Sequence, residues 1–128
     1  MKAWMGMVLL AGALANGTVL AADVEGGMKF FKSCRGLLNY WNGKPVEANY
    51  DAAAMGYCVG VVHGVRASLQ YLEGWLKNDH AKVCLPASYE EAMGVQAVVK
   101  FLDDHPDEVK KDAALITMLA LKSEYPCR

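Results

Sequence analysis

Four cysteines constrain the fold of this 128-residue chain more than any other feature of its sequence. They lie at Cys34, Cys58, Cys84 and Cys127, and none belongs to a Cys-x-x-Cys pair of the kind that thioredoxin-like redox proteins use. An even number of cysteines in a short exported chain favours disulfide bonds over metal ligands or nucleophiles. We therefore predict a small fold stapled by two disulfides, provided that the chain is exported.

The N-terminus indicates export. Lys2 gives a short positive start, residues 5–20 are mostly apolar, and small or apolar residues lead to Ala21. We predict a signal peptide over residues 1–21, cleaved after Ala21, and one domain over residues 22–128. The apolar run is interrupted by glycines and Asn16 and is shorter than the roughly 20 residues of a membrane span, which disfavours the alternative of a retained anchor. The predicted location is the bacterial periplasm, with no membrane association after cleavage.

The charge balance excludes two classes of partner. The chain has 13 basic and 14 acidic residues, a net charge of −1 at pH 7, and loss of Lys2 with the signal would leave about −2. Nucleic acid and anionic lipid are both bound by clustered basic surfaces. We therefore expect neither as a partner.

Apolar residues recur at helical spacing in four segments, and no segment alternates as a strand would. We predict helices over about 31–41, 52–77, 89–102 and 106–123, with a loop over 42–50 and Asp51 as a helix cap. Ser88 and Glu91 have the spacing of a capping box, which would start the third helix at Tyr89. The predicted fold is all-α, a small bundle of four to five helices.

Two rows run along the second predicted helix. One is an apolar seam at steps of three and four, formed by Met55, Val59, Val62, Val65, Leu69, Leu72 and Leu76. The other advances by four through Gly56, Gly60 and Gly64. Each glycine costs a helix about 1 kcal/mol relative to alanine, so three in register suggest close packing of another backbone. We expect this row to pack closely, either within the subunit or across a dimer.

Four cysteines allow three pairings, which sequence alone does not resolve. If the first two helices form an antiparallel hairpin about a centre near Val46, Cys34 and Cys58 are equidistant from it. The same construction about Pro106 places Cys84 nearly opposite Cys127. We predict Cys34–Cys58 and Cys84–Cys127, each stabilising the fold by roughly 3 to 4 kcal/mol on the chain-entropy model.

No catalytic signature is present. The sequence contains no Gly-x-Ser-x-Gly, no His-Glu-x-x-His and no glycine-rich phosphate loop. His63 is expected on a polar helix face, His80 in a polar loop and His105 at a helix junction. A metal site of His80 with Cys84 is disfavoured because Cys84 is predicted in a disulfide, and the acidic residues near Asp103 lack the spacing of an EF-hand. We predict no catalytic residues, no metal and no cofactor.

Four short segments resemble a known family in their order and spacing. They read CVGVVHGV at 58–65, CLP at 84–86 followed by a helix, FLDDHP at 101–106 and YPC at 125–127. Together they resemble the Rap/Tai family of immunity proteins over nearly all of the chain after the signal. The resemblance implies an exported helical protein, often a homodimer, that binds a cell-wall amidase effector of type VI secretion in the periplasm and occludes its active-site cleft.

An inhibitor of this kind would use loops and exposed aromatic side chains on a rigid scaffold. The candidates that we select are Trp41, Tyr50, Trp75, Asn78, Asp79 and His80. Helix-end core packing is the competing interpretation for the two tryptophans. Three alternative functions remain at this stage: a periplasmic acid-stress chaperone, a family member without a cognate toxin, and an enzyme of unrecognised type.

Overall fold

A computed structural model describes residues 24–128 of the chain. The predicted signal peptide and its cleavage after Ala21 lie outside the described residues. Within the described part, none of the helices has both the length and the apolar character needed to cross a membrane.

The described residues form four α-helices joined by loops and short 3-10 helices. The α-helices are α1 (Val24–Trp41), α2 (Ala52–Leu72), α3 (Glu91–Asp104) and α4 (Ala113–Glu124). The 3-10 helices are η1 (Glu73–Trp75), η2 (Asp79–Ala81) and η3 (Pro106–Lys110). This part of the chain contains no strand, only an isolated bridge between Val83 and Pro126. The prediction of an all-α fold is confirmed.

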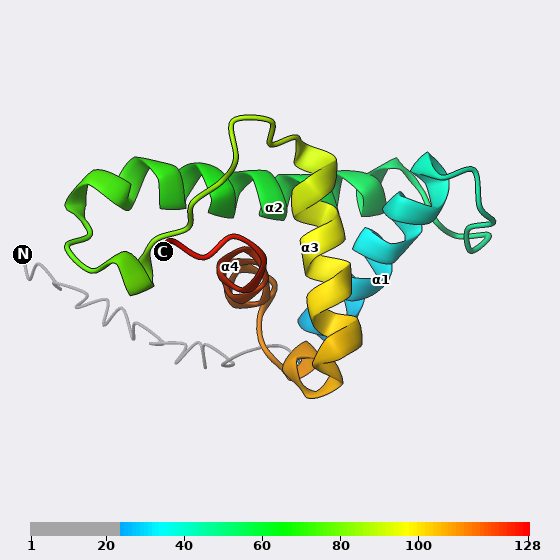
Figure 1. The fold of residues 1–128 in the computed structure, drawn as a ribbon. Helices are drawn as coiled ribbons and strands as arrows, with labels where there is room; N and C mark the ends of the chain where they lie inside the picture. The colour runs from blue at the N-terminus through cyan, green and yellow to red at the C-terminus, as the bar shows by residue number, and fades with distance from the viewer. Residues whose placement is uncertain (1–23) are drawn as a thin grey trace, which may run out of the picture.

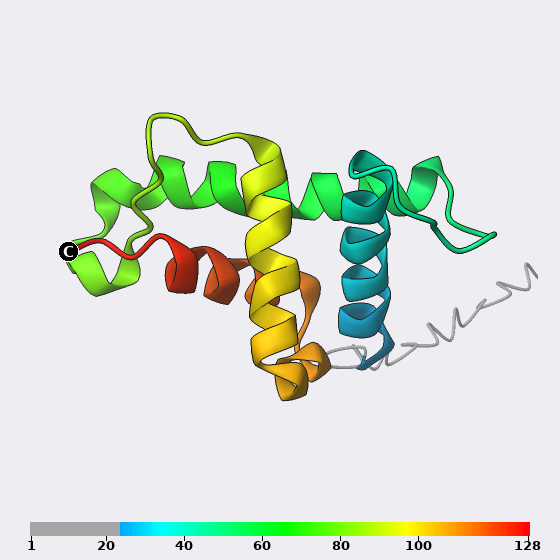
Figure 2. The ribbon, with the colours of Figure 1, turned by 45° about the vertical axis from the view of Figure 1, so that its right-hand side comes forward.

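The long helix α2 organises the molecule. α1 and α3 cross one side of α2 at a steep angle, and α4 lies alongside its C-terminal half (Figures 1 and 2). α1 therefore crosses α2. The hairpin construction assumed that the two helices run antiparallel side by side, and that assumption is wrong. The C-terminal end of α2 extends past the crossing with α3, so its last turns have neighbours on fewer sides.

The core lies where the four helices meet. Side chains from every helix are buried there, and the largest fully buried ones outside the disulfides are Phe30, Val62, Val95, Val98, Leu102, Ile116 and Leu121. The predicted apolar seam of α2 supplies Val62 to this core. Leu72, the last residue of α2 and also a member of the seam, is 47% exposed because this end of the helix extends past the crossing with α3.

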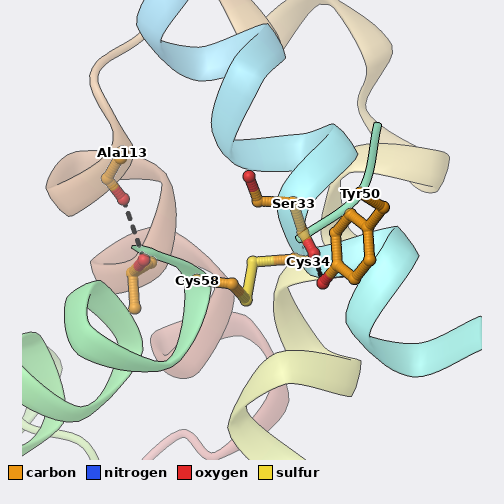
Figure 3. The surroundings of a disulfide bond; sticks show 6 residues. Ser33, Cys34, Tyr50, Cys58 and Ala113 are labelled. Atoms are coloured by element: carbon orange, nitrogen blue, oxygen red, sulfur yellow. Dashed lines mark hydrogen bonds between the residues drawn. A yellow bond between two sulfur atoms is a disulfide. The ribbon is translucent and has the colours of Figure 1, made fainter. Parts of the chain in front are cut away.

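Both predicted disulfides are present. Cys34–Cys58 joins α1 to α2 with a Cα–Cα distance of 5.1 Å, at the place where the two helices cross (Figure 3). Both cysteines are fully buried. Cys84–Cys127 joins two extended segments, with a Cα–Cα distance of 5.0 Å. The backbone N–H of Cys84 also donates to the carbonyl oxygen of Tyr125 at 2.9 Å, next to the Val83–Pro126 bridge.

Several predicted helix ends are wrong. α1 begins at Val24, well before residue 31, and α2 ends at Leu72, where the chain tightens into η1. Asp51 does cap α2, because its carboxylate accepts from the N–H of Ala54 at 3.0 Å. The predicted capping box of Ser88 and Glu91 does not form, since α3 begins at Glu91 with Glu90 as its cap.

The last predicted helix is two elements. The 3-10 helix η3 begins at Pro106, as proline permits in a first turn, and ends at Lys110. α4 starts after Asp112, whose carboxylate accepts from the N–H of Leu115 at 2.9 Å. Next to the break, the chain packs closely on Gly27 of α1. A Cβ there would lie 2.0 Å from the carbonyl oxygen of Val109, so the backbone of η3 packs directly on α1.

The glycine row of α2 does not pack within the subunit. Apart from the helix's own nearby backbone, no atom of the described residues lies within 4 Å of where a Cβ would stand at Gly56, Gly60 or Gly64. That alternative for the row is wrong, and the dimer alternative stays a prediction. The close approaches occur at Gly27, Gly36 and Gly94, where a Cβ would meet atoms at 2.5 Å or less.

Candidate partner-binding surfaces

The structure places the six candidate residues at opposite ends of α2. Trp41 and Tyr50 lie at the N-terminal end, where α1 ends and the loop leads into α2. Trp75 and residues 78–80 lie beyond its C-terminal end, in η1 and η2. A helix of 21 residues spans about 30 Å, so the two groups cannot form one contiguous contact patch.

The C-terminal group gains Tyr71 and Leu72, which the sequence analysis did not select. Tyr71 is 79% exposed, and Trp75, which was selected, is 77% exposed. We call these three side chains, together with Asn78, Asp79 and His80, the distal patch. The apolar periodicity of α2 does not reveal the exposure of Leu72, since the same spacing describes a buried face. Only the position of the helix end relative to α3 does so.

The loop of the distal patch is held by contacts among its own residues. The side-chain oxygen of Asn78 accepts from the N–H of His80 at 2.9 Å and caps η2. Asp79 pairs with Lys82 at 3.0 Å. A few residues on, the Cys84–Cys127 disulfide fixes the chain to the C-terminal segment. Anchoring at both ends presents the aromatic side chains on a scaffold that loses little conformational entropy on binding.

At the other end of α2, Tyr50 is only half exposed. Its hydroxyl donates to the carbonyl oxygen of Ser33 at 2.8 Å (Figure 3). Its ring covers Gly36, where a Cβ would lie 2.5 Å from ring atom Cε2. Burial raises the pKa of the Tyr50 hydroxyl. Trp41 is 45% exposed at the end of α1, so the structure brings the aromatic pair to one end but buries much of the tyrosine.

A groove opens beside Tyr50. Its volume is about 1060 Å³, and α1, the 45–51 segment, the first turn of α2 and η3 line it. Its lining includes lysines of α1 and η3, and the carboxylates of Glu47 and Asp51 from the 45–51 segment. We call this the α1 groove. It was not anticipated from the sequence, because its walls come from segments far apart along the chain.

The three histidines lie on different elements. His63 on α2 sits between α2 and α3, where its Nδ1 is 3.0 Å from both Glu91 Oε1 and Arg66 Nη2. One ring nitrogen can donate to the carboxylate or accept from the guanidinium but cannot do both, so the tautomer selects the partner. His80 belongs to the distal patch, and His105 stacks on Phe101 with ring centroids 4.7 Å apart.

The polar junction around His63 continues to Tyr89, whose ring lies 5.8 Å from the Arg66 guanidinium carbon. Burial, with a smaller contribution from the Glu91 carboxylate, raises the pKa of Tyr89 to about 12. The Tyr89 hydroxyl is buried and has no hydrogen-bond partner among the described residues. No group of three or more His, Cys, Asp or Glu side chains suited to a metal ion occurs in residues 24–128.

A family model described as Rap1a immunity proteins matches residues 26–127, which include all four α-helices apart from the first residues of α1. No curated protein and no solved structure matched the chain.

Proposed function

This chain belongs to the family of Rap1a immunity proteins, and from that membership we propose that it neutralises a peptidoglycan amidase effector of type VI secretion in the periplasm. Membership implies an immunity role carried out by binding a partner effector protein. The amidase, the secretion route and the compartment are the proposed refinements. Disulfides of the kind found here persist in oxidising compartments, which supports the periplasm.

The exposed aromatic residues of the distal patch are the observation that carries the proposal. Large aromatic side chains that remain mostly exposed on a rigid scaffold are typical of protein interfaces, where they anchor in pockets of the partner. Tyr71 and Trp75 meet that description, and they precede a loop that the second disulfide anchors. We propose that this loop enters the cleft of the amidase and excludes its substrate sterically.

A pull-down tests the proposal. The oxidised protein, isolated from periplasm, is used as bait against the secreted proteins of its own host. We expect one cell-wall amidase in stoichiometric amount, with its hydrolysis of peptidoglycan blocked. Recovery of no amidase, or of many unfolded proteins only near pH 2 to 3, would contradict the proposal, and the second result would favour a chaperone.

We also propose that the protein is a homodimer in which the glycine row of α2 faces a second copy. Gly56, Gly60 and Gly64 lie on an exposed helix face, and Ser68 continues the row one turn later. Side chains that do not protrude allow two helix backbones to approach closely. The lack of any intrachain neighbour at these glycines leaves an intermolecular contact as the packing explanation for the row.

A further inference from the structure

We propose that the α1 groove is a second binding site, which takes a peptide segment rich in both acidic and apolar side chains. The groove lies at the end of α2 opposite the distal patch. The proposal therefore does not depend on the identity of the effector or on how the distal patch binds it.

The size of the groove favours a chain segment over a small molecule. Its volume of about 1060 Å³ is at the top of the range for small-molecule pockets, roughly 300 to 1,000 Å³. It is built from four separate segments of the chain and lies open to solvent along one side. Apolar side chains contribute to its lining, and Met28 and Val46 among them are markedly exposed for residues of their type.

The lysines that line the groove favour a ligand with acidic side chains. Lys29 and Lys32 extend from α1, and Lys110 from η3. No carboxylate among the side chains that the structure describes lies within ion-pair distance of Lys32 or Lys110, whereas the nearby Arg35 is paired with Asp103. Lys29 already lies over the Tyr57 ring, 5.7 Å from its centroid. Lys32 and Lys110, without a carboxylate partner among the described residues, are positive groups that an anionic partner would match.

Carboxylates in the lining disfavour a polyanion such as a nucleic acid. Glu47 and Asp51 belong to the 45–51 segment, and the Asp51 carboxylate accepts from the N–H of Ala54. A uniformly negative backbone would meet repulsion from these two side chains. A peptide can place acidic side chains toward the lysines and apolar ones over Met28 and Val46.

The side-chain amides of the groove suit a peptide backbone. Asn39 and Asn49 line it, and each carries both a donor and an acceptor for main-chain groups. The site is also preformed: Tyr50 is fixed on Gly36 and Ser33, and the buried Cys34–Cys58 disulfide joins the two helices behind it. A preformed groove does not lose binding energy to the ordering of its own walls.

Titration with a synthetic peptide tests the proposal. The probe is a capped peptide of about twelve residues in which aspartate or glutamate alternates with leucine, and its control has lysine in place of each acid. We expect the oxidised full chain to bind the acidic peptide, with weaker binding as salt rises, and not to bind the basic one. Equal binding of the two peptides, or binding of neither, overturns the proposal.

Charge reversal locates the site. Lys32→Glu combined with Lys110→Glu should weaken peptide binding by about tenfold or more, because attraction becomes repulsion at two positions. Lys77→Glu, an equal change per site at the other end of α2, should leave binding unchanged, and so should Trp75→Ala. Unchanged binding in the double variant overturns the assignment, as does capture of soluble peptidoglycan fragments in place of the peptide. The side chains at the four substituted positions are exposed, so we expect every variant to keep the fold. These positions are Lys32, Trp75, Lys77 and Lys110.

Discussion

At the scale of single residues, the contact between Gly36 and Tyr50 shows how the α1 groove is fixed. The Tyr50 ring occupies the space that any larger residue at position 36 would need. We expect Gly36→Ala to lower the free energy of unfolding by about 1 to 3 kcal/mol, the typical cost of overpacking. Urea unfolding measures it. Gly74→Ala is the matched control, since it lies outside the glycine row and a Cβ there would meet no atom of the described residues within 4 Å beyond its neighbouring backbone, and an equal loss in both variants would contradict the explanation.

Tyr89 gives a second prediction at this scale. Its buried hydroxyl lacks a partner among the residues that the structure describes, so Tyr89→Phe should leave the free energy of unfolding at neutral pH unchanged or raise it by about 1 kcal/mol. Chemical denaturation at pH 7 measures this difference. A loss of more than about 1 kcal/mol would mean that the hydroxyl is satisfied after all.

The same residue predicts an alkaline effect. The pKa of Tyr89 is raised to about 12 in the fold, against an ordinary value of 10.0 in the unfolded chain. The fold therefore favours the neutral phenol. The contribution of this group is complete below pH 10 and is lost as the pH rises from 10 through 12. The stability of the native protein relative to Tyr89→Phe should fall over that interval, and parallel curves for the two proteins would contradict the assignment.

At the scale of elements, the glycine row of α2 separates two outcomes. In a monomer with this face exposed, Gly60→Ala should raise the free energy of unfolding by about 1 kcal/mol, since alanine is the better helix former. In a dimer packed on the row, Gly60→Leu should lower the dimer mass to that of a monomer without loss of helix content. Light scattering and circular dichroism measure both. A dimer that persists in Gly60→Leu would remove the row from the interface.

Local sequence predicts the elements well where the deciding contacts are local. The periodicity of α2 and the cap at Asp51 are of this kind. The Ser88 prediction failed because the N–H of Tyr89 bonds to the carbonyl oxygen of Pro86, which places these residues in a turn before the helix. The break near Lys111 was not predicted. It lies where the chain packs on Gly27, more than 80 residues earlier, and local sequence does not reveal such a contact.

The same distinction holds for the candidate surfaces. Trp75, Asn78, Asp79 and His80 are near one another in sequence, and the structure keeps them together in the distal patch. Tyr71 and Leu72 are exposed because the C-terminal end of α2 extends past its crossing with α3. The local sequence does not reveal where that crossing lies. The α1 groove forms only when α1, the 45–51 segment, α2 and η3 are all in place, so no local sequence pattern predicts it.

At the scale of the whole molecule, the two disulfides differ in access. Cys34 and Cys58 are fully buried in the core, whereas Cys84 is exposed and Cys127 partly so. Thiol attack requires access to a sulfur atom. Stepwise reduction should therefore open Cys84–Cys127 first, and mass spectrometry after alkylation measures the order. Simultaneous opening, or earlier loss of the buried bond, would contradict this.

Loss of the outer disulfide should also separate binding from folding. A Cys84→Ala, Cys127→Ala double variant keeps the core but frees one anchor of the distal patch. We expect it to remain helical with a lower midpoint of thermal unfolding and to bind the proposed effector at least tenfold more weakly. Tyr40→Ala, which removes an exposed aromatic side chain outside the candidate set, is the control and should bind as the native protein does. Full binding by the double variant would show that the anchor is dispensable.

The positions of the two disulfides along the chain also fix the order in which they can form. In the proposed exported protein, Cys34 and Cys58 both precede α3, so their bond can form before the second half of the chain has reached the periplasm. Cys84 must wait for Cys127, 43 residues later. The surface that we assign to the effector is thus the last part of the molecule to be cross-linked. We therefore expect a newly made copy to bind its effector fully only after the Cys84–Cys127 bond has formed.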